Sequence, residues 1–239
     1  MNDLLSMNFH YKNVFVDFDD TLWDIHANGK EALQETFDAY RLGNNFASFN
    51  DFYTIYMVRN HELWDKYRMG EIKKKELVLN RFLYPLQQGG IDDEAFALRM
   101  SDDFLEATTT KTKLIPYAKE ILDYLSPFYR LFIISNGFSE VQYKKLVNSG
   151  LDAYFEKVIL SEDAQANKPN PLIFDYALRN TNSRRNETIM IGDSWEADIV
   201  GAKNSRIDQI FFNHTNPPPT MEFQPTFMIR SLKEIERIL

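Results

Sequence analysis

Apolar residues recur along this chain in two different patterns, and the change between them divides the sequence. Residues 28–108 show helical periodicity throughout and contain no short apolar run bounded by turn residues. Helices are predicted over residues 30–43, 50–70, 73–86 and 92–107. Asn50 is the expected N-cap of the second helix, and Gly43 and Gly70 are the expected stops of the first two. Four helices without a strand indicate a separate helical unit.

Outside this region, short apolar runs alternate with helical segments. Strands are predicted at Val14–Val16 and at residues 130–135, 157–160, 188–192, 209–212 and 226–229. Helices are predicted between them, at residues 119–125, 139–150, 171–180 and 195–204. This alternation is typical of a parallel sheet covered by helices on both faces. The strand at Val14–Val16 finds no partner before the helical block, so the chain is predicted to be an α/β domain with a helical insertion after its first strand.

Composition narrows the class of protein. The net charge is −8, which argues against a nucleic acid polymer as partner because such binding needs a basic surface. The absence of cysteine excludes disulfides, thiol nucleophiles and thiolate metal sites. No apolar run is long enough for a signal peptide or a membrane span, so we expect a cytoplasmic protein without a membrane partner. For the oligomeric state, we expect a monomer or a small homo-oligomer.

Polar side chains follow four of the predicted strands at their carboxyl ends, where parallel sheets bind ligands. In chain order these are Asp17, Asp19 and Thr21, then Ser135, Asn136 and Gly137, then Lys168, and finally Asp193 with Asp198. Because the strands are predicted to be parallel, their carboxyl ends meet at one edge of the sheet. Acids, one hydroxyl and one amine are therefore expected to converge there.

This set of side chains favours phosphoryl transfer. Crowded carboxylates repel one another unless a cation lies among them, and Mg²⁺ prefers oxygen ligands of this kind. A serine hydroxyl, a lysine ammonium and backbone N–H groups can hold phosphoryl oxygens. A carboxylate can act as the nucleophile, and a second carboxyl two residues further on can protonate the leaving group and then activate water.

Four motifs resemble those of the haloacid dehalogenase superfamily of phosphohydrolases. They are DFDDT at residues 17–21, Ser135 in IISNG, Lys168 in NKPNP, and GDSWEAD at residues 192–198. A lone DxDxT is a weak signal, whereas four motifs in order, each after a predicted strand, are specific. The resemblance covers nearly the whole chain. It implies a Rossmann-like three-layer core with a central, mainly parallel sheet, formed by residues 1–24 and 109–239, and an all-helical cap of the C1 type at residues 25–108.

The resemblance also implies roles for the acidic motifs. Asp17 attacks phosphorus and becomes an aspartyl phosphate, while Asp19 acts as general acid and then as general base, its backbone carbonyl binding Mg²⁺. Thr21 orders the turn and Asp19. Asp193 is a direct metal ligand, and Asp198 belongs to the metal site by supporting the metal's waters or the motif lysine.

The same resemblance assigns the phosphoryl-binding groups. Ser135 and Lys168 hold the phosphoryl group, and the backbone N–H of Asn136 helps, with Gly137 in the same substrate-binding turn. Asp20 occupies a variable position of the first motif and receives no catalytic role. The substrate implied is a small phosphorylated metabolite.

Part of the helical insertion suggests which metabolite this is. The stretch at residues 63–82, which includes Trp64, Tyr67 and Arg68, resembles the cap of a subgroup that removes phosphate from pyrimidine nucleoside monophosphates. An aromatic ring that stacks on a base and an arginine at a polar ring edge would suit this use. An ordinary core stripe is the alternative, because aromatics at helical spacing usually pack inside.

The sequence also bears on several other functions. Asp19 speaks against a dehalogenase, which lacks the second aspartate. A capped phosphomutase or a sugar-phosphate phosphatase of the same superfamily stays open. A phospho-receiver signalling domain is shorter and carries its phosphorylated aspartate after a middle strand, and a silent binding protein would usually lack a motif residue. A calcium loop fails because Leu22 and Asn28 stand where it needs Gly and Glu. The leading prediction is a Mg²⁺-dependent phosphatase, with a 5′-nucleotidase as its more specific form.

Overall fold

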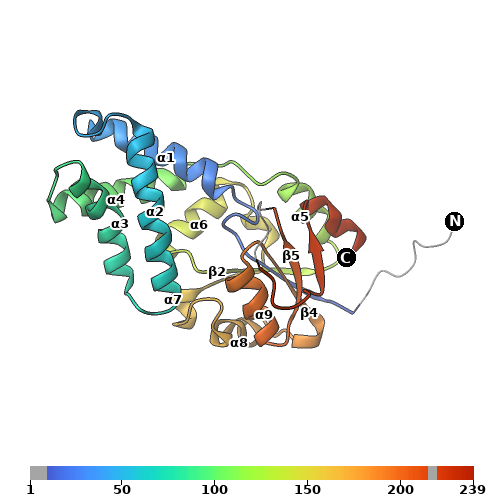
Figure 1. Ribbon diagram of the computed structural model, residues 1–239. Coiled ribbons are helices and arrows are strands. Elements are labelled where there is room, and N and C mark those ends of the chain that lie inside the picture. The colour runs from blue at the N-terminus through green and yellow to red at the C-terminus, as the bar shows by residue number, and fades with distance from the viewer. Residues whose placement is uncertain (1–9, 215–219) are drawn as a thin grey trace. The chain divides into compact units, whose positions relative to one another are not determined.

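The computed structural model of the protein describes residues 10–214 and 220–239 (Figure 1). The chain divides into two compact units. The first contains Asp24 and the described residues before it together with Lys113–Leu239, and the second is Ile25–Thr112. The first unit holds the sheet, and the second is helical.

The sheet of the first unit has six strands. They are β1 (Asn13–Val16), β2 (Arg130–Ser135), β3 (Lys157–Leu160), β4 (Thr188–Gly192), β5 (Asp208–Phe212) and β6 (Phe227–Ile229). Their order is β3-β2-β1-β4-β5-β6, and every neighbouring pair is parallel. Val14 of β1 pairs with Leu131 on one side and with Ile189 on the other. The predicted α/β fold is confirmed, and the first strand lies in the middle of the sheet.

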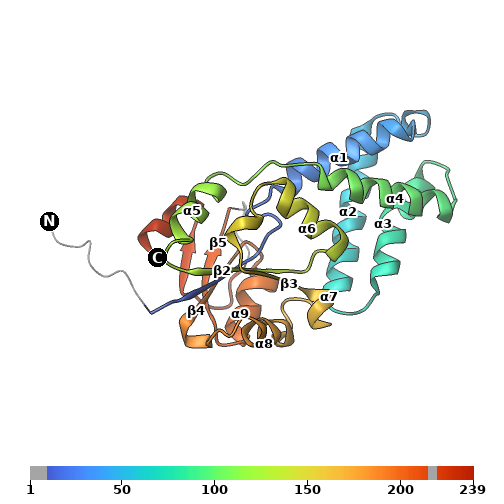
Figure 2. The same ribbon diagram turned by 180° about the vertical axis from the view of Figure 1, so that it is seen from behind.

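Alternation along β1 explains how two helical layers cover the sheet. Val14 and Val16 belong to one hydrophobic cluster, which includes residues of α5 and α6, and Phe15 belongs to another, which includes residues of α8 and α9. The helices of this unit are α5 (Ala118–Leu125), α6 (Ser139–Asn148), α7 (Ser161–Ala164), α8 (Pro171–Asn180) and α9 (Gly201–Asn204). Figures 1 and 2 show α5 and α8 on opposite sides of the sheet. Because both faces of the strands are buried, ligand-binding side chains are left at the strand ends.

The turn after β4 differs from the prediction. One α-helix was expected over residues 195–204, but Trp195–Val200 is a π-helical segment, and α9 follows only from Gly201. Asp198 lies within this segment, and its Oδ2 accepts a hydrogen bond of 3.0 Å from the Ser194 N–H. The wider π-helical turn accompanies the fully buried position of Asp198, and such segments are frequent at functional sites.

The second unit contains α1 (Ile25–Ala39), α2 (Phe49–Arg68), α3 (Lys74–Gln88) and α4 (Glu94–Thr109). Its core is rich in aromatic rings, and the rings of Phe82 and Phe104 meet edge to face with their centroids 5.5 Å apart. Offset and edge-to-face pairs of this kind add stability to the apolar area that they bury. In the part of the chain that the structure describes, no helix has the length and apolar character of a membrane span.

Two helix ends in this unit were predicted wrongly. The N-cap of α2 is Ser48 and not Asn50, because the Ser48 hydroxyl accepts a hydrogen bond from the backbone N–H of Asp51 at 3.2 Å. The first helix ends at Ala39, before Gly43, because Arg41 adopts a positive φ of 54°. Gly70, with a φ of 74°, lies one residue beyond the C-cap Met69 of α2 and marks the end of this helix as predicted.

The chain leaves and re-enters the first unit at one place. Trp23 and Leu114 form an antiparallel bridge, and the Asp24 N–H donates a hydrogen bond of 3.1 Å to the carbonyl of Lys113. A further hydrogen bond of 2.9 Å runs from the Ile115 N–H to the carbonyl of Leu22. The two ends of the helical insertion are therefore joined within the sheet-containing unit.

Candidate active site

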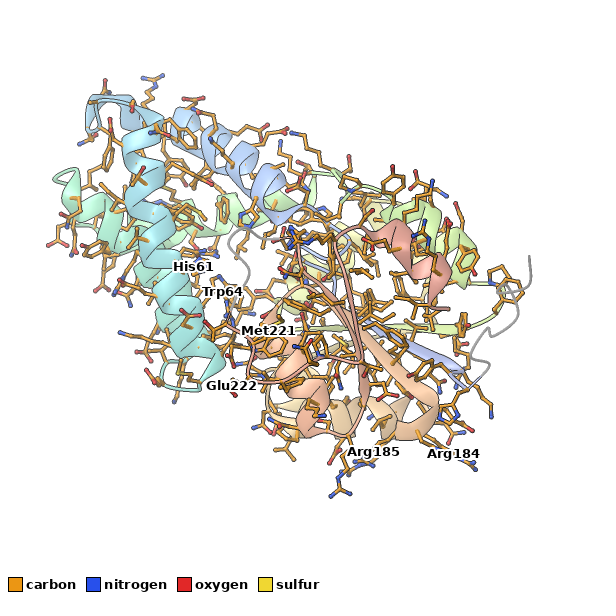
Figure 3. All side chains as sticks on the ribbon, turned by 45° about the vertical axis from the view of Figure 1, so that its right-hand side comes forward. His61, Trp64, Arg184, Arg185, Met221 and Glu222 are labelled. Carbon is orange, nitrogen blue, oxygen red and sulfur yellow. The ribbon has the colours of Figure 1, made fainter. Side chains whose placement is uncertain are left out.

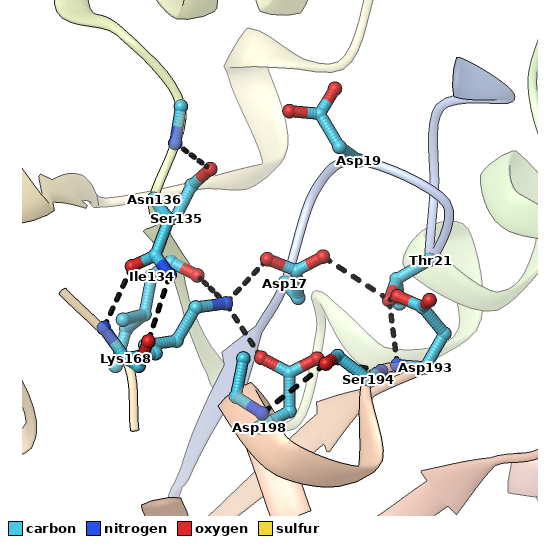
Figure 4. Close-up of polar contacts among 12 residues, drawn as sticks. Asp17, Asp19, Thr21, Ile134, Ser135, Asn136, Lys168, Asp193, Ser194 and Asp198 are labelled. Carbon is cyan, nitrogen blue, oxygen red and sulfur yellow. Dashed lines mark hydrogen bonds and ion pairs between the residues drawn. The ribbon is translucent and has the colours of Figure 1, made fainter. Parts of the chain in front are cut away.

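Asp17 lies at the centre of the polar side chains that follow the strands. It comes directly after β1, its side chain is buried, and its backbone N–H donates to the carbonyl of Ile191 in β4 at 2.9 Å. Figure 4 shows that the carboxylate faces Lys168 on one side and Thr21 with Asp193 on the other. Residues following β1, β3 and β4 therefore meet here, as the parallel topology predicts.

Lys168 is a buried ammonium with a complete set of acceptors. Its Nζ donates to Asp17 Oδ1 at 2.5 Å, to Asp198 Oδ1 at 2.6 Å and to the carbonyl oxygen of Ile134 at 2.8 Å. An ammonium has three N–H groups, so each has a partner. Burial alone would lower the pKa of Lys168, but the charges of Asp17 and Asp198 outweigh it and raise that pKa. The lysine is fixed as a cation between two carboxylates.

The carboxylates nevertheless carry more negative charge than this lysine balances. Burial, together with the charges of Asp198 and Asp19, raises the pKa of Asp17 to about 7 despite the attraction of Lys168. Burial and the charges of Asp17 and Asp198 also raise the pKa of Asp193 well above its ordinary value. One oxygen from each of Asp17, Asp193 and Asp198 lies within 4.8 Å of the others. Carboxylate oxygens are hard ligands, and this group carries negative charge that Lys168 does not balance. The residues therefore fit a divalent metal ion.

Thr21 joins the loop after β1 to the loop after β4. Its hydroxyl donates to Asp193 Oδ1 at 2.8 Å and lies 3.4 Å from Asp17 Oδ2, and it accepts a hydrogen bond from the Asp193 N–H at 3.1 Å. The predicted role of ordering Asp19 is not what these contacts provide. They fix the position of Asp193 relative to Asp17.

Ser135 ends β2, and Asn136 and Gly137 form the turn that follows it. The Ser135 Oγ accepts hydrogen bonds from the Gly137 N–H at 3.0 Å and from Gln142 Nε2 at 2.8 Å. The Asn136 side chain accepts from the Lys168 N–H at 2.7 Å and donates back to the Lys168 carbonyl at 3.0 Å. Asn136 therefore anchors the loop that carries the lysine, a role that sequence reasoning did not assign to its side chain.

Asp198 is fully buried, and both of its oxygens have partners, Lys168 for Oδ1 and the Ser194 N–H for Oδ2. Of the two roles foreseen for it, these contacts favour support of the lysine. The space that it occupies depends on Gly192, because a Cβ atom there would lie 2.3 Å from Asp198 Oδ2.

Asp19 lies apart from the hydrogen bonds that surround Asp17 (Figure 4). Its Oδ1 accepts from Lys145 Nζ at 3.0 Å, and its Oδ2 accepts from Gln142 Nε2 at 2.8 Å. Sequence reasoning missed both α6 residues. Their spacing places them on one face of that helix, but nothing in the sequence distinguishes Lys145 from its exposed neighbour Lys144.

A second group of ligand atoms lies beside the first. Oxygens of Asp20 and Asp193 and a ring nitrogen of His214 come within 4.8 Å of one another. Asp20 receives no catalytic role from the sequence because it occupies a variable position of the first motif, and His214 lies outside all four motifs. The long-range contact that brings them together could not be read from the chain.

The three predicted cap residues lie together near the end of α2, where Figure 3 labels Trp64. The rings of Trp64 and Tyr67 meet edge to face with centroids 5.7 Å apart, and Arg68 Nη1 is paired with Asp65 Oδ1 at 3.0 Å. All three side chains are half-buried. Their part in substrate binding stays a prediction.

The chain is similar over almost its full length to several known proteins. It is 32% identical to the HAD hydrolase YfnB of Bacillus subtilis, covering 96% of this chain and 95% of that protein. It is 29% identical to the pyrimidine 5′-nucleotidase YjjG of Escherichia coli (95% and 96% covered) and 30% identical to the pyrimidine 5′-nucleotidase PynA of Streptococcus pneumoniae (94% and 93% covered).

Comparison of the fold with solved structures also finds a HAD hydrolase. The crystal structure of YfnB bound to magnesium superimposes with a TM-score of 0.86 at 30% sequence identity, covering 96% of this chain and 98% of that one. The sequence profile of the haloacid dehalogenase-like hydrolases matches residues 14–212, which include all four motifs. On the motifs, the sheet and these likenesses together, the chain belongs to the haloacid dehalogenase-like hydrolase family.

Proposed function

We propose that this protein is a Mg²⁺-dependent phosphatase of small phosphomonoesters that forms a covalent phosphoryl intermediate on Asp17. The observation that carries the proposal is the setting of the Asp17 carboxylate, buried at the end of the central strand between the Lys168 ammonium and the Thr21–Asp193 pair. A carboxylate fixed in this way is held for attack on a phosphoryl group that reaches the sheet edge.

In the first step, a carboxylate oxygen of Asp17 forms a bond to phosphorus, and the bond from phosphorus to the ester oxygen breaks. The leaving oxygen takes the proton of the Asp19 carboxyl group. Ser135, at the end of β2, and Lys168, in the loop after α7, hold the non-bridging phosphoryl oxygens during this transfer, and one Lys168 N–H group turns from Asp17 to the phosphoryl group for this purpose.

In the second step, Asp19 accepts a proton from water as the water oxygen attacks phosphorus. The bond from phosphorus to Asp17 breaks, which releases inorganic phosphate and restores the carboxylate. The two carboxyl groups thus return to their starting forms after one turnover.

Asp17 and Asp193, with the backbone carbonyl of Asp19, are the groups that we propose to bind the metal, and Asp198 supports the site through its contact with Lys168. A bound Mg²⁺ would supply the positive charge that these carboxylates lack and would offset the charge of the phosphoryl oxygens. The magnesium in the related YfnB crystal structure supports this choice of ion.

For the substrate, we propose pyrimidine nucleoside 5′-monophosphates, and for the helical unit the role of a cap that selects them. Two relatives that align with almost the whole chain are named pyrimidine 5′-nucleotidases, and Trp64, Tyr67 and Arg68 supply aromatic and cationic groups suited to a base. A small phosphorylated molecule is then the partner of the protein.

The test is a turnover assay on a panel of nucleoside monophosphates and sugar phosphates, with Mg²⁺ and with a chelator. We expect the highest kcat/KM on uridine, cytidine or thymidine monophosphate, and loss of turnover in the chelator with recovery on added Mg²⁺. Higher kcat/KM on sugar phosphates would refute the substrate class, and full turnover by Asp17→Asn would refute the nucleophile.

A further inference from the structure

The α6 residues that contact Asp19 are buried polar groups without an assigned role. Gln142 is 2% exposed and Lys145 is 6% exposed, and both reach the carboxylate that the proposed function makes the general acid and base. Buried polar side chains are costly unless they are paired, so a pair of this kind held against one carboxylate calls for an explanation.

Lys145 is held from two sides. Its Nζ lies 3.0 Å from Asp19 Oδ1 and 4.2 Å from the centroid of the Trp23 ring. Trp23 is fully buried and stacks on Phe18, the residue between the two catalytic aspartates, at a centroid distance of 6.3 Å. A cation over an indole face is attracted to it, so the ammonium is fixed where Asp19 can bind it.

Gln142 links Asp19 to the phosphoryl-binding serine. Its Nε2 donates to Asp19 Oδ2 and to Ser135 Oγ, both at 2.8 Å. The opposite amide orientation would place Oε1 against the carboxylate, which only accepts hydrogen bonds, so Asp19 fixes Nε2 on this side. Oε1 itself is buried and has no hydrogen-bond partner within residues 10–214 and 220–239. A buried oxygen without a hydrogen bond is unfavourable. This cost is offset here by the two hydrogen bonds that Nε2 donates to Asp19 and Ser135.

The contacts of Ser135 determine where its hydroxyl hydrogen can point. A hydroxyl has one hydrogen and two acceptor positions, and the Gly137 N–H and the Gln142 amide occupy the two acceptor positions. The hydrogen is thereby left for an outside acceptor, as a phosphoryl oxygen would be. Gly137 also makes room for the glutamine, because a Cβ there would lie 2.2 Å from Gln142 Nε2.

We infer that Gln142 and Lys145 are positioning residues that set the direction and spacing of Asp19 relative to the phosphoryl-binding hydroxyl of Ser135. Asp19 Oδ2 and Ser135 Oγ each lie 2.8 Å from the same nitrogen, Gln142 Nε2, so the carboxylate and the hydroxyl are close to each other. One phosphoryl group can then contact Ser135 with one oxygen and Asp19 with its leaving oxygen. The inference rests on the proposed function, because it concerns the proton transfer from Asp19 to the leaving group.

The leaving group provides the test. Nucleoside monophosphates leave as alkoxides and need the proton of Asp19, whereas p-nitrophenyl phosphate releases a stable phenolate that needs it far less. We expect Lys145→Met and Gln142→Leu to lower kcat on uridine monophosphate by roughly tenfold to a hundredfold more than kcat on p-nitrophenyl phosphate. Lys145→Arg should restore part of the difference, because a guanidinium keeps the charge and the donors.

The matched control is Lys144→Met, which makes the same charge change at an exposed position of α6 and should leave the ratio of the two kcat values unchanged. An equal loss on both substrates would show only a structural role and would overturn the inference, as would an unchanged ratio in folded variants, checked by circular dichroism. An inactive wild-type protein would instead refute the proposed function, so the two failures are distinct.

Discussion

Replacing Asp17 by Asn should remove a loss of stability that the metal-free wild type suffers as pH rises towards 8, while abolishing turnover. The pKa of this carboxyl is raised from 3.8 to about 7, chiefly by burial, so the folded protein holds the proton over a pH range in which the unfolded chain has lost it. The side chain is suited to chemistry and poorly suited to stability, a combination common at active sites.

The sign of the pH dependence follows from proton counting. Between the unfolded pKa of 3.8 and the folded pKa of about 7, the folded state binds more protons than the unfolded state, so the free energy of unfolding falls as pH rises through this window. Asn has no proton to lose and lacks this decline. From about pH 5 to about pH 8, the stability of Asp17→Asn relative to wild type should therefore rise by roughly 2–3 kcal/mol, at 1.36 kcal/mol per pKa unit.

The assay is urea unfolding at several pH values in a chelator, with wild type, Asp17→Asn and the exposed control Asp152→Asn. Added Mg²⁺ should stabilise the wild type and should reduce the advantage of the Asn variant, because a ligand of the folded state stabilises it by mass action. If wild type and Asp17→Asn lose stability in parallel from about pH 5 to about pH 8, the Asp17 carboxyl is ionised throughout that range, and the reasoning from burial is refuted.

Three further outcomes are expected. Lys168→Met should lower the free energy of unfolding by about 3–5 kcal/mol near neutral pH, because it leaves two buried carboxylates without their cation; a smaller loss in urea unfolding would contradict this. Gly192→Ala should reduce kcat by roughly tenfold or more, since its Cβ would displace the Asp198 carboxylate, whereas Gly43→Ala, with open space around its Cβ, should have no effect on turnover. Trp64→Ala should raise KM for nucleoside monophosphates while leaving p-nitrophenyl phosphate turnover unchanged, and equal KM changes for both would argue against stacking on a base.

The fold could be predicted because its determinants are local. Short apolar runs alternating with helices specify a parallel sheet, and parallel strands bring their carboxyl ends to one edge, which is why Asp17, Lys168 and Asp193 could be expected together. The position of the first strand between β2 and β4 depends on pairings more than a hundred residues away along the chain. No local pattern carries that information.

The supporting side chains of the site were beyond sequence reasoning for the same reason. Gln142 and Lys145 acquire their function from where α6 lies against the loop after β1, and the Asn136 side chain from where the loop after β3 returns. The π-helical segment around Asp198 is a further case. Its residue types suit an ordinary α-helix, and the buried contacts of Asp198 with Lys168 and Ser194 favour the π-helical form instead.

The pairing of Trp23 with Leu114 has a consequence for how such a protein can diversify. The chain exits and re-enters the sheet-containing unit at adjacent points that are hydrogen-bonded to each other. Residues 25–112 are therefore an insertion whose two ends are paired. The entropic cost of closing such an insertion grows only slowly with its length. Helical units of different length and sequence can therefore be exchanged at this point through recombination, and under the role that we propose for this unit each exchange would give a new substrate range to the same reacting groups.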